Sequence, residues 1–469
     1  MVIADSREDR APSSPLQRII PIVLLIGSFG YILAWLTRDA DPWLFMQVAA
    51  IGALFVYFLT FVDIVLGLAI LIGCVGLSPE IVLGGVRHLR LEDFLIPSLL
   101  MAWLLRAGQR REPLALVGIG GPALAYLVAL TISAVVGVAT GTTTPMGVLE
   151  LMRKYMEYFA LFLLIINNIR TEQEFKALVL FSVMVAVASA LLSSGSALTN
   201  PSIGSKVQGP LGETANIYGG YLIINISMAM GLFLHAPTPN LRIASSAAMV
   251  LLGIPLLHTY SRTSSVSLAA ALFIFGVLRE RRVMLLLMIL AALVPIIAPE
   301  SVLNHLGTVL GLATGANPPS WAARVEAWEG AVPHVLGASP LIGFGPGSVR
   351  RGDIDCEYVR ALVDTGILGL GAFVWLLVRT LRIAFVRYGE IEGPGFHKGV
   401  SAGFLIAFFS LCIHAVAATS FTAIRTAEMF MILMGFFFCQ LNHLKEWSAP
   451  TAPAPAPAVA SPHPERTFV

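Results

Sequence analysis

The stretch IASSAAMVLLGIPLLHTYSRTSSVSLAAALFIFGVL, residues 243–278, contains two apolar runs joined by a short polar turn. Both runs are continuous, and a helix of about 20 mainly apolar residues is long enough to cross a bilayer. The turn carries Arg262, whose charge would cost roughly 2.5–3.5 kcal/mol at the centre of a membrane helix. The stretch therefore predicts two membrane helices that meet at an interface, with Arg262 between them.

The whole chain has the same character. Of its 469 residues, 57% are hydrophobic and 12% are charged, whereas soluble domains carry roughly 25% charged residues. The apolar runs are continuous rather than alternating, which favours helices over a membrane barrel. The fold class predicted is an all-α integral membrane protein. A net charge of +2 gives no reason to expect nucleic acid as a partner.

We expect about 12–14 transmembrane helices. The apolar runs lie at 19–36, 43–61, 62–77, 93–106, 114–139, 150–168, 176–195, 216–235, 242–260, 264–279, 282–298, 358–383, 399–419 and 424–444. The second and third runs are short and could form a re-entrant hairpin. A tail at 1–18, the helices of 19–298, an outer loop at 299–358, the helices of 359–446 and a disordered Pro/Ala-rich tail at 447–469 complete the expected organisation.

Lys and Arg in short loops mark the cytoplasmic side of a membrane protein. The loops RAGQRRE (106–112) and RERR (279–282) alternate correctly with both termini in the cytoplasm, so the loop 299–358 faces outward. In this loop Trp321, Val325 and Trp328 recur at helical spacing. The pattern predicts an amphipathic helix lying on the outer surface of the bundle.

Several charges gather at the predicted outer mouth, although positive charge is normally biased to the inside. They are the cations Arg153, Lys206, Arg262 and Arg324 and the carboxylates of Asp355 and Glu357. Arginine binds phosphate oxygens bidentately, and a nearby carboxylate can act as a general base. The set suits a reaction on a lipid pyrophosphate, which carries its own leaving group.

Each charge also has a plainer explanation. Arg153 could snorkel from a helix end, Lys206 could be solvated in a loop, and Arg262 could anchor its span at the interface. Arg324 could be a surface charge of its helix, and the two carboxylates could be helix-start residues favoured by the dipole. At the start of the last span, Arg425 and the glutamate three residues later could pair with each other.

Four short motifs occur in order along the second half of the chain. They are GPLGETANIYGGYL (209–222), YSRTSSVSL (260–268), SWAARVEAWEGAVPHVLGASPLIGFGPGS (320–348) and DCEYVRALVDTGILGLGAF (355–373). In this order and topology they resemble the O-antigen ligase and O-antigen (exopolysaccharide) polymerase superfamily of multispan membrane proteins. The resemblance implies a C-type glycosyltransferase-like fold and an inverting, metal-independent glycosyl transfer from undecaprenyl pyrophosphate, without a cofactor, at the periplasmic face of the inner membrane.

The resemblance also implies roles for particular residues. Arg262 and Arg324 would bind the donor pyrophosphate, with Arg153 and Lys206 as further candidates. Asp355 ranks first as the base and Glu357 second, and both could face one cavity if their segment is extended. The residues Asn216, Tyr218 and Tyr358 are candidates for substrate binding or structural support.

One departure bears on the reaction. Ligases that join O-antigen to lipid A core typically have histidine and asparagine where this chain has Asp355 and Cys356. An aspartate there is more like the exopolysaccharide polymerases, so polymerisation of repeat units is favoured over ligation, and a lipid-linked sugar transporter is the less favoured alternative. The expected partners are the lipid-linked glycan, an acceptor glycan, the bilayer, a chain-length regulator and a flippase.

Overall fold

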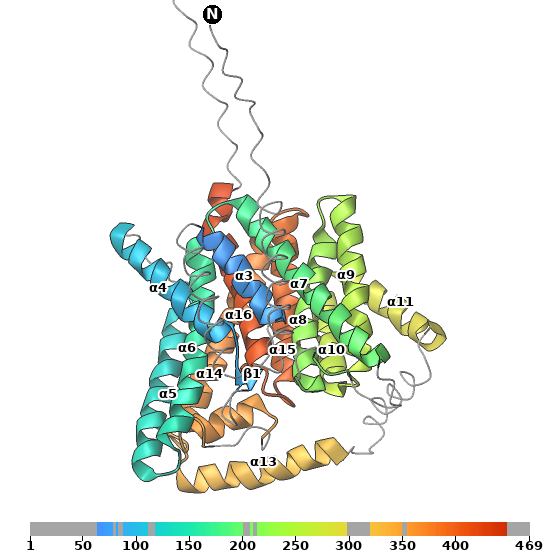
Figure 1. Ribbon diagram of the computed structural model, residues 1–469. Coiled ribbons are helices and arrows are strands. Elements are labelled where there is room, and N and C mark those ends of the chain that lie inside the picture. Colours follow the sequence, from blue (N-terminus) through green and yellow to red (C-terminus); the bar gives the residue numbers. More distant parts are fainter. Residues whose placement is uncertain are drawn as a thin grey trace, which may run out of the picture.

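The computed structural model describes residues 63–77, 81–82, 88–110, 118–199, 207–209, 213–297, 319–348 and 354–447. Within these ranges the chain is almost entirely helical (Figure 1). The helices are α3 (Ile64–Leu77), α4 (Glu92–Arg110), α5 (Gly120–Thr140), α6 (Pro145–Asn168), α7 (Glu172–Thr199), α8 (Ala215–His235), α9 (Pro239–His258), α10 (Arg262–Leu278), α11 (Arg281–Ile297), α13 (Pro319–Ala338), α14 (Glu357–Glu390), α15 (Phe396–His414) and α16 (Ile424–Trp447). A two-residue antiparallel ladder of β1 (Ile81–Val82) and β2 (His88–Leu89) precedes α4.

The all-α multispan class is confirmed. In the part of the chain that the structure describes, seven helices are long and apolar enough to cross a membrane, namely α5, α7, α8, α9, α14, α15 and α16. The apolar helices α3 and α10 are shorter, and α4, α6 and α11 coincide with three further expected spans. The expected spans 19–36 and 43–61, the tail 1–18 and the tail from 448 lie outside the described residues.

Glycine brings α8 and α15 into direct contact at the centre of the bundle. A Cβ atom added to Gly231 would lie 2.2 Å from the carbonyl oxygen of Gly399 and 2.3 Å from the amide nitrogen of Gly403. The two glycines of α15 are four residues apart, the small-xxx-small spacing that lets membrane helices approach closely. Helices α8, α15 and α16 therefore form the buried centre, while α5 and α10 expose large apolar side chains.

A break interrupts α14 at Gly366, whose φ is 65° and ψ is −167°. The carbonyl groups released there are bound by the glycine-rich turn after α13, since Phe344 N–H donates to Val363 at 2.8 Å and Gly345 N–H donates to Asp364 at 3.0 Å. A Cβ at Gly366 would lie 2.3 Å from the carbonyl carbon of Leu341. The turn LIGFGPG therefore supplies the hydrogen-bond donors for the carbonyl groups that the break leaves without a helical partner.

Helix α13 lies across one end of the bundle (Figure 1). Its inward face carries Val335, which packs with Cys356 and Leu362 of the α14 start, and Trp328, which packs against the same cluster. Trp321 meets Trp328 edge to face with ring centroids 5.4 Å apart. A helix is confirmed where the tryptophan spacing predicted one, and its tryptophan face is the packed face. We call this end of the bundle, where α8, α10, α14 and α16 begin and α9 and α15 end, the α13 end.

Candidate active site

Arg324 lies on the inward face of α13. Its spacing from Trp321 and Trp328 places it on the packed side of the helix, while Glu326 and Glu329 are exposed. The Arg324 side chain is 18% exposed, and its Nη2 lies 3.4 Å from the Asp355 Oδ2 atom. If Arg324 were only a surface charge, its side chain would lie on the exposed face of α13 with Glu326 and Glu329. The structure instead directs this guanidinium toward the start of α14.

Asp355 and Glu357 face different surroundings, so the expectation that both acids face one cavity is wrong. The Asp355 side chain is 43% exposed beside Arg324, whereas Glu357 is 3% exposed. The Glu357 carboxylate accepts the Phe421 N–H at 3.0 Å and the Thr422 hydroxyl. The reason is that Glu357 is already the first residue of α14, so the extended alternation ends before it.

Glu357 and Tyr358 fasten α14 to the end of α15 and the loop that follows. The Glu357 N–H donates to the Ala415 carbonyl at 2.9 Å, and the Tyr358 hydroxyl donates to the Cys412 carbonyl at 2.8 Å. On the far side, the Tyr158 hydroxyl donates to the Thr422 carbonyl at 2.9 Å. Glu357 and Tyr358 therefore fix the start of α14, just after Asp355.

Arg262 is the first residue of α10. Tyr260 before it has a positive φ of 50°, and the Ser261 side chain caps the helix by accepting the Ser264 N–H. The Ser261 hydroxyl also donates to Asn216 Oδ1 at 3.0 Å. Thus the turn that opens α10 and the first turn of α8 are joined, and Arg262 and Asn216 lie together at the α13 end.

His414 joins the end of α15 to this corner. Its Nε2 lies 3.0 Å from the hydroxyl of Ser264, in the first turn of α10. Arg324, Asp355, Arg262 and Asn216 therefore lie at the α13 end, where α8, α10 and α14 begin and α15 ends. No local pattern singles out His414 in the sequence, since it is the last residue of the apolar helix α15.

Three other candidates are placed differently. Tyr218 is 0% exposed and its hydroxyl lies 2.9 Å from the Ser193 hydroxyl, a core position. Arg153 pairs with Asp93 at 2.8 Å and with Glu157, in a polar cluster between α4 and α6. Lys206 lies outside the described residues.

The predicted pairing within the first turn of α16 is wrong. Arg425 instead pairs with Glu213, just before α8, with the two atoms Nε and Oε1 2.8 Å apart. Both side chains are buried, at 0% and 3% exposure. The Glu428 carboxylate is also buried, and within the described residues its oxygens accept no hydrogen bond. The Arg425–Glu213 pair ties α16 to the entrance of α8.

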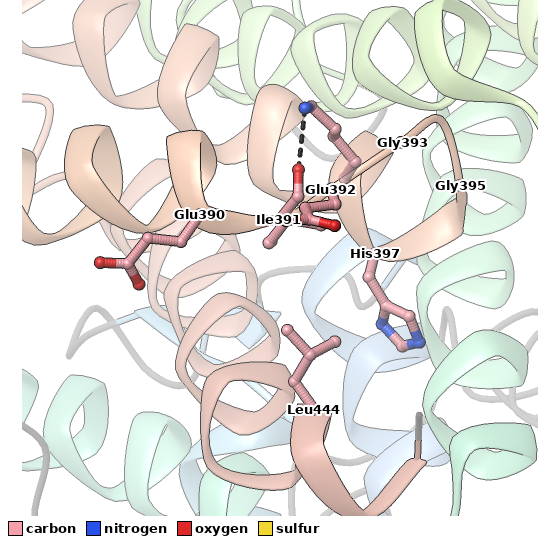
Figure 2. A pocket seen from close by; sticks show the side chains of 8 residues that line it. Glu390, Ile391, Glu392, Gly393, Gly395, His397 and Leu444 are labelled. Carbon is pink, nitrogen blue, oxygen red and sulfur yellow. Dashed lines mark hydrogen bonds between the residues drawn. The ribbon is translucent and has the colours of Figure 1, made fainter. Parts of the chain in front are cut away.

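A cavity of about 340 Å³ lies at the opposite end of the bundle, between the α14–α15 loop and α16 (Figure 2). The Lys398 ammonium at this cavity donates to the Ile391 carbonyl at 2.8 Å. Glu390 points away from the other labelled residues in Figure 2 and pairs with Arg387 at 2.6 Å. No arginine is among the residues that line this cavity, so the candidate site remains at the α13 end.

A comparison with known families bears on these same segments. Residues 247–374 match the O-antigen ligase family. The match begins within α9, includes α10, α11 and α13, and ends within α14, and it confirms the resemblance to the O-antigen ligase and polymerase superfamily. No curated protein matches the chain. The match, together with the apolar helices, supports a multipass membrane protein that contains an O-antigen ligase segment.

The family segment contains Arg262, Arg324 and Asp355. Asn216 and His414 lie outside it, and the fold brings them to the same end. The O-antigen ligase match therefore covers the charged residues of the candidate site, while part of the surrounding hydrogen-bonded structure comes from other segments.

Proposed function

We propose that this protein polymerises lipid-linked polysaccharide repeat units. The donor is a glycan on undecaprenyl pyrophosphate, the acceptor is a sugar hydroxyl of another glycan, and the reaction takes place at the periplasmic face of the inner membrane. The observation that carries the proposal is the inward Arg324 side chain, which meets Asp355 at 3.4 Å at the α13 end.

The chemistry follows from these two groups. The acceptor hydroxyl attacks the anomeric carbon, the bond from that carbon to the pyrophosphate oxygen breaks, and the hydroxyl proton passes to Asp355. Arg324 and Arg262 stabilise the charge that develops on the departing lipid pyrophosphate, because guanidinium groups bind phosphate oxygens in a fork. Attack from the face opposite the leaving group inverts the anomeric configuration.

The positions of the other residues narrow the proposed site. Arg153 already pairs with two carboxylates of a separate cluster, so we assign it a structural role. Glu357 is buried and holds the loop after α15, so Asp355 is the proposed base. Asn216 accepts from the Ser261 hydroxyl, so we assign it to the support of the turn that carries Arg262. Lys206 stays a candidate for the pyrophosphate by its place in the sequence.

Ligation to lipid A core is the second candidate function. Ligation would use the same arginine side chains to bind a lipid pyrophosphate. However, this chain has Asp355 at the position of the ligases' histidine, which favours polymerisation. Cells that lack this protein distinguish the two. Lipid-linked single repeat units, without longer chains, support polymerisation. Long chains that remain unattached to lipid A core would contradict it and assign ligation.

A further inference from the structure

Five side chains at the α13 end form a continuous chain of hydrogen bonds. The Ser420 hydroxyl lies 2.8 Å from His414 Nδ1, and His414 Nε2 lies 3.0 Å from the Ser264 hydroxyl. The Ser264 hydroxyl lies 2.8 Å from that of Ser261, which donates to Asn216 Oδ1 at 3.0 Å. The residues belong to α8, the start of α10, the end of α15 and the loop that follows α15.

The chain closes on itself. The Asn216 Nδ2 group donates to the Ala417 carbonyl at 3.4 Å, and Ala417 lies three residues before Ser420 in the loop between α15 and α16. This same loop donates from Phe421 and Thr422 to the Glu357 carboxylate. The bonded ring therefore joins the support of the Asp355 segment to the turn that carries Arg262.

The direction of every bond in the ring follows from counting protons. A serine hydroxyl has a single hydrogen. Because Ser261 donates its hydrogen to Asn216 Oδ1, it must accept from Ser264. Ser264 has then used its own hydrogen and must accept from His414. His414 consequently carries its proton on Nε2. Because the His414 side chain is 1% exposed, a charged imidazole would be costly there, so the imidazole is neutral and its bare Nδ1 accepts from Ser420.

We propose that His414 is a positioning residue for the donor site. As the Nε2–H tautomer it fixes the Ser264 hydroxyl. Through Ser264 it also fixes Ser261, the N-cap of α10, and so determines the position of the Arg262 side chain. At its other nitrogen it fixes the loop that supports the Asp355 segment. His414 is 1% exposed, so it acts through these partners and does not touch the substrate.

This inference rests on the proposed function, because it assumes that Arg262 binds a pyrophosphate. If His414 acts through Arg262, removal of the ring's bonds should weaken pyrophosphate binding only while Arg262 is present. Two changes that act through one group are non-additive, whereas independent changes add. A residue that merely holds the fold together would lower stability without this dependence on Arg262.

The test measures binding of farnesyl pyrophosphate to the purified full chain in detergent, with farnesyl monophosphate as the comparison. Ser264→Ala should raise the Kd for the pyrophosphate roughly fivefold to tenfold, and it should have no further effect in an Arg262→Ala background. Ser410→Ala is the matched control, since Ser410 is a buried serine of α15 whose hydroxyl makes no hydrogen bond within the described residues.

Replacements of His414 itself separate the ring's chemistry from its bulk. Glutamine can place an N–H near the position of Nε2, so His414→Gln should bind the probe within about threefold of wild type, while the apolar His414→Leu should match Ser264→Ala. Additive effects of Ser264→Ala and Arg262→Ala would overturn the positioning role alone. Failure of the wild type to prefer the pyrophosphate would overturn the donor assignment, and the positioning role with it.

Discussion

A guanidinium and an ammonium have the same charge and differ in geometry, and the proposed role of Arg324 depends on that difference. Arg324→Lys should keep a cation facing the α14 start and lose the bidentate fork. We expect both Arg324→Lys and Arg324→Ala to reduce polymer at least tenfold, since a hydrogen bond to a charged group contributes roughly 1.5–3 kcal/mol.

The control for this prediction lies on the same helix. Glu329 is on the exposed face of α13, so Glu329→Ala should leave polymer length and amount unchanged. Polymer is measured by gel electrophoresis of glycans from cells with equal amounts of each variant in the membrane. Wild-type polymer from Arg324→Ala would contradict a role in donor binding.

The two acids near the start of α14 should respond to amide substitution in opposite ways. Asp355 is 43% exposed, so Asp355→Asn should abolish polymer and leave the unfolding temperature unchanged. Glu357 is buried and accepts two hydrogen bonds, so Glu357→Gln leaves one donor poorly paired, at a cost of about 1–3 kcal/mol. We expect it to lower the unfolding temperature of the purified protein.

Measurement of both quantities on both variants decides the assignment. Thermal unfolding in detergent reports stability, and polymer per folded molecule reports catalysis. Full activity in Asp355→Asn would mean that the acceptor proton goes elsewhere. A loss of activity in Glu357→Gln without any loss of stability would transfer the role of base to the buried acid.

At the scale of the element, the break in α14 depends on one glycine. Gly366→Ala should destabilise the protein, because alanine tolerates a φ of 65° poorly and its Cβ would lie 2.3 Å from the carbonyl carbon of Leu341. Strained positions of this kind cost about 1–3 kcal/mol. Gly371→Ala is the control in the same helix, since a Cβ at Gly371 meets nothing within 4 Å. Equal membrane levels and equal unfolding temperatures for the two variants would contradict the account of the break.

The helices were predictable because each is a continuous apolar run, and α13 because its tryptophans recur at helical spacing. The sequence could not reveal how α14 is broken, since that depends on carbonyl groups of one segment meeting amides of another. The pairing of Arg425 with Glu213 is of the same kind: local spacing suggested a neighbour three residues away, and the fold supplied a partner from before α8.

The candidate site was predictable only in part. Arg262, Arg324 and Asp355 stand out as charges in an apolar chain, and the fold gathers them at one end. His414 and its serines carry no such signal, because serine and histidine at the ends of apolar runs are common. The pair of Arg153 and Glu157 has the i,i+4 spacing of one helix, whereas Asp93 lies on α4, whose packing against α6 the sequence does not show.

For the whole molecule, the proposed topology places the α13 end outside and the end of α16 inside. Glu329 and Glu446 are exposed at these opposite ends. In a background without the native cysteines, Glu329→Cys should react with a membrane-impermeant maleimide on intact cells, and Glu446→Cys should react only after permeabilisation. The reverse pattern would contradict the periplasmic site.

The most direct measurement of the central claim is elongation by the purified protein. The wild-type chain in detergent is mixed with lipid-linked repeat units, without a membrane gradient, and the products are separated by length. We predict a ladder of longer lipid-linked glycans from the wild type and none from Arg324→Ala at equal folded concentration. The absence of a ladder from the wild type, or a wild-type ladder from Arg324→Ala, would contradict the claim that this end of the bundle polymerises glycans by gripping a lipid pyrophosphate.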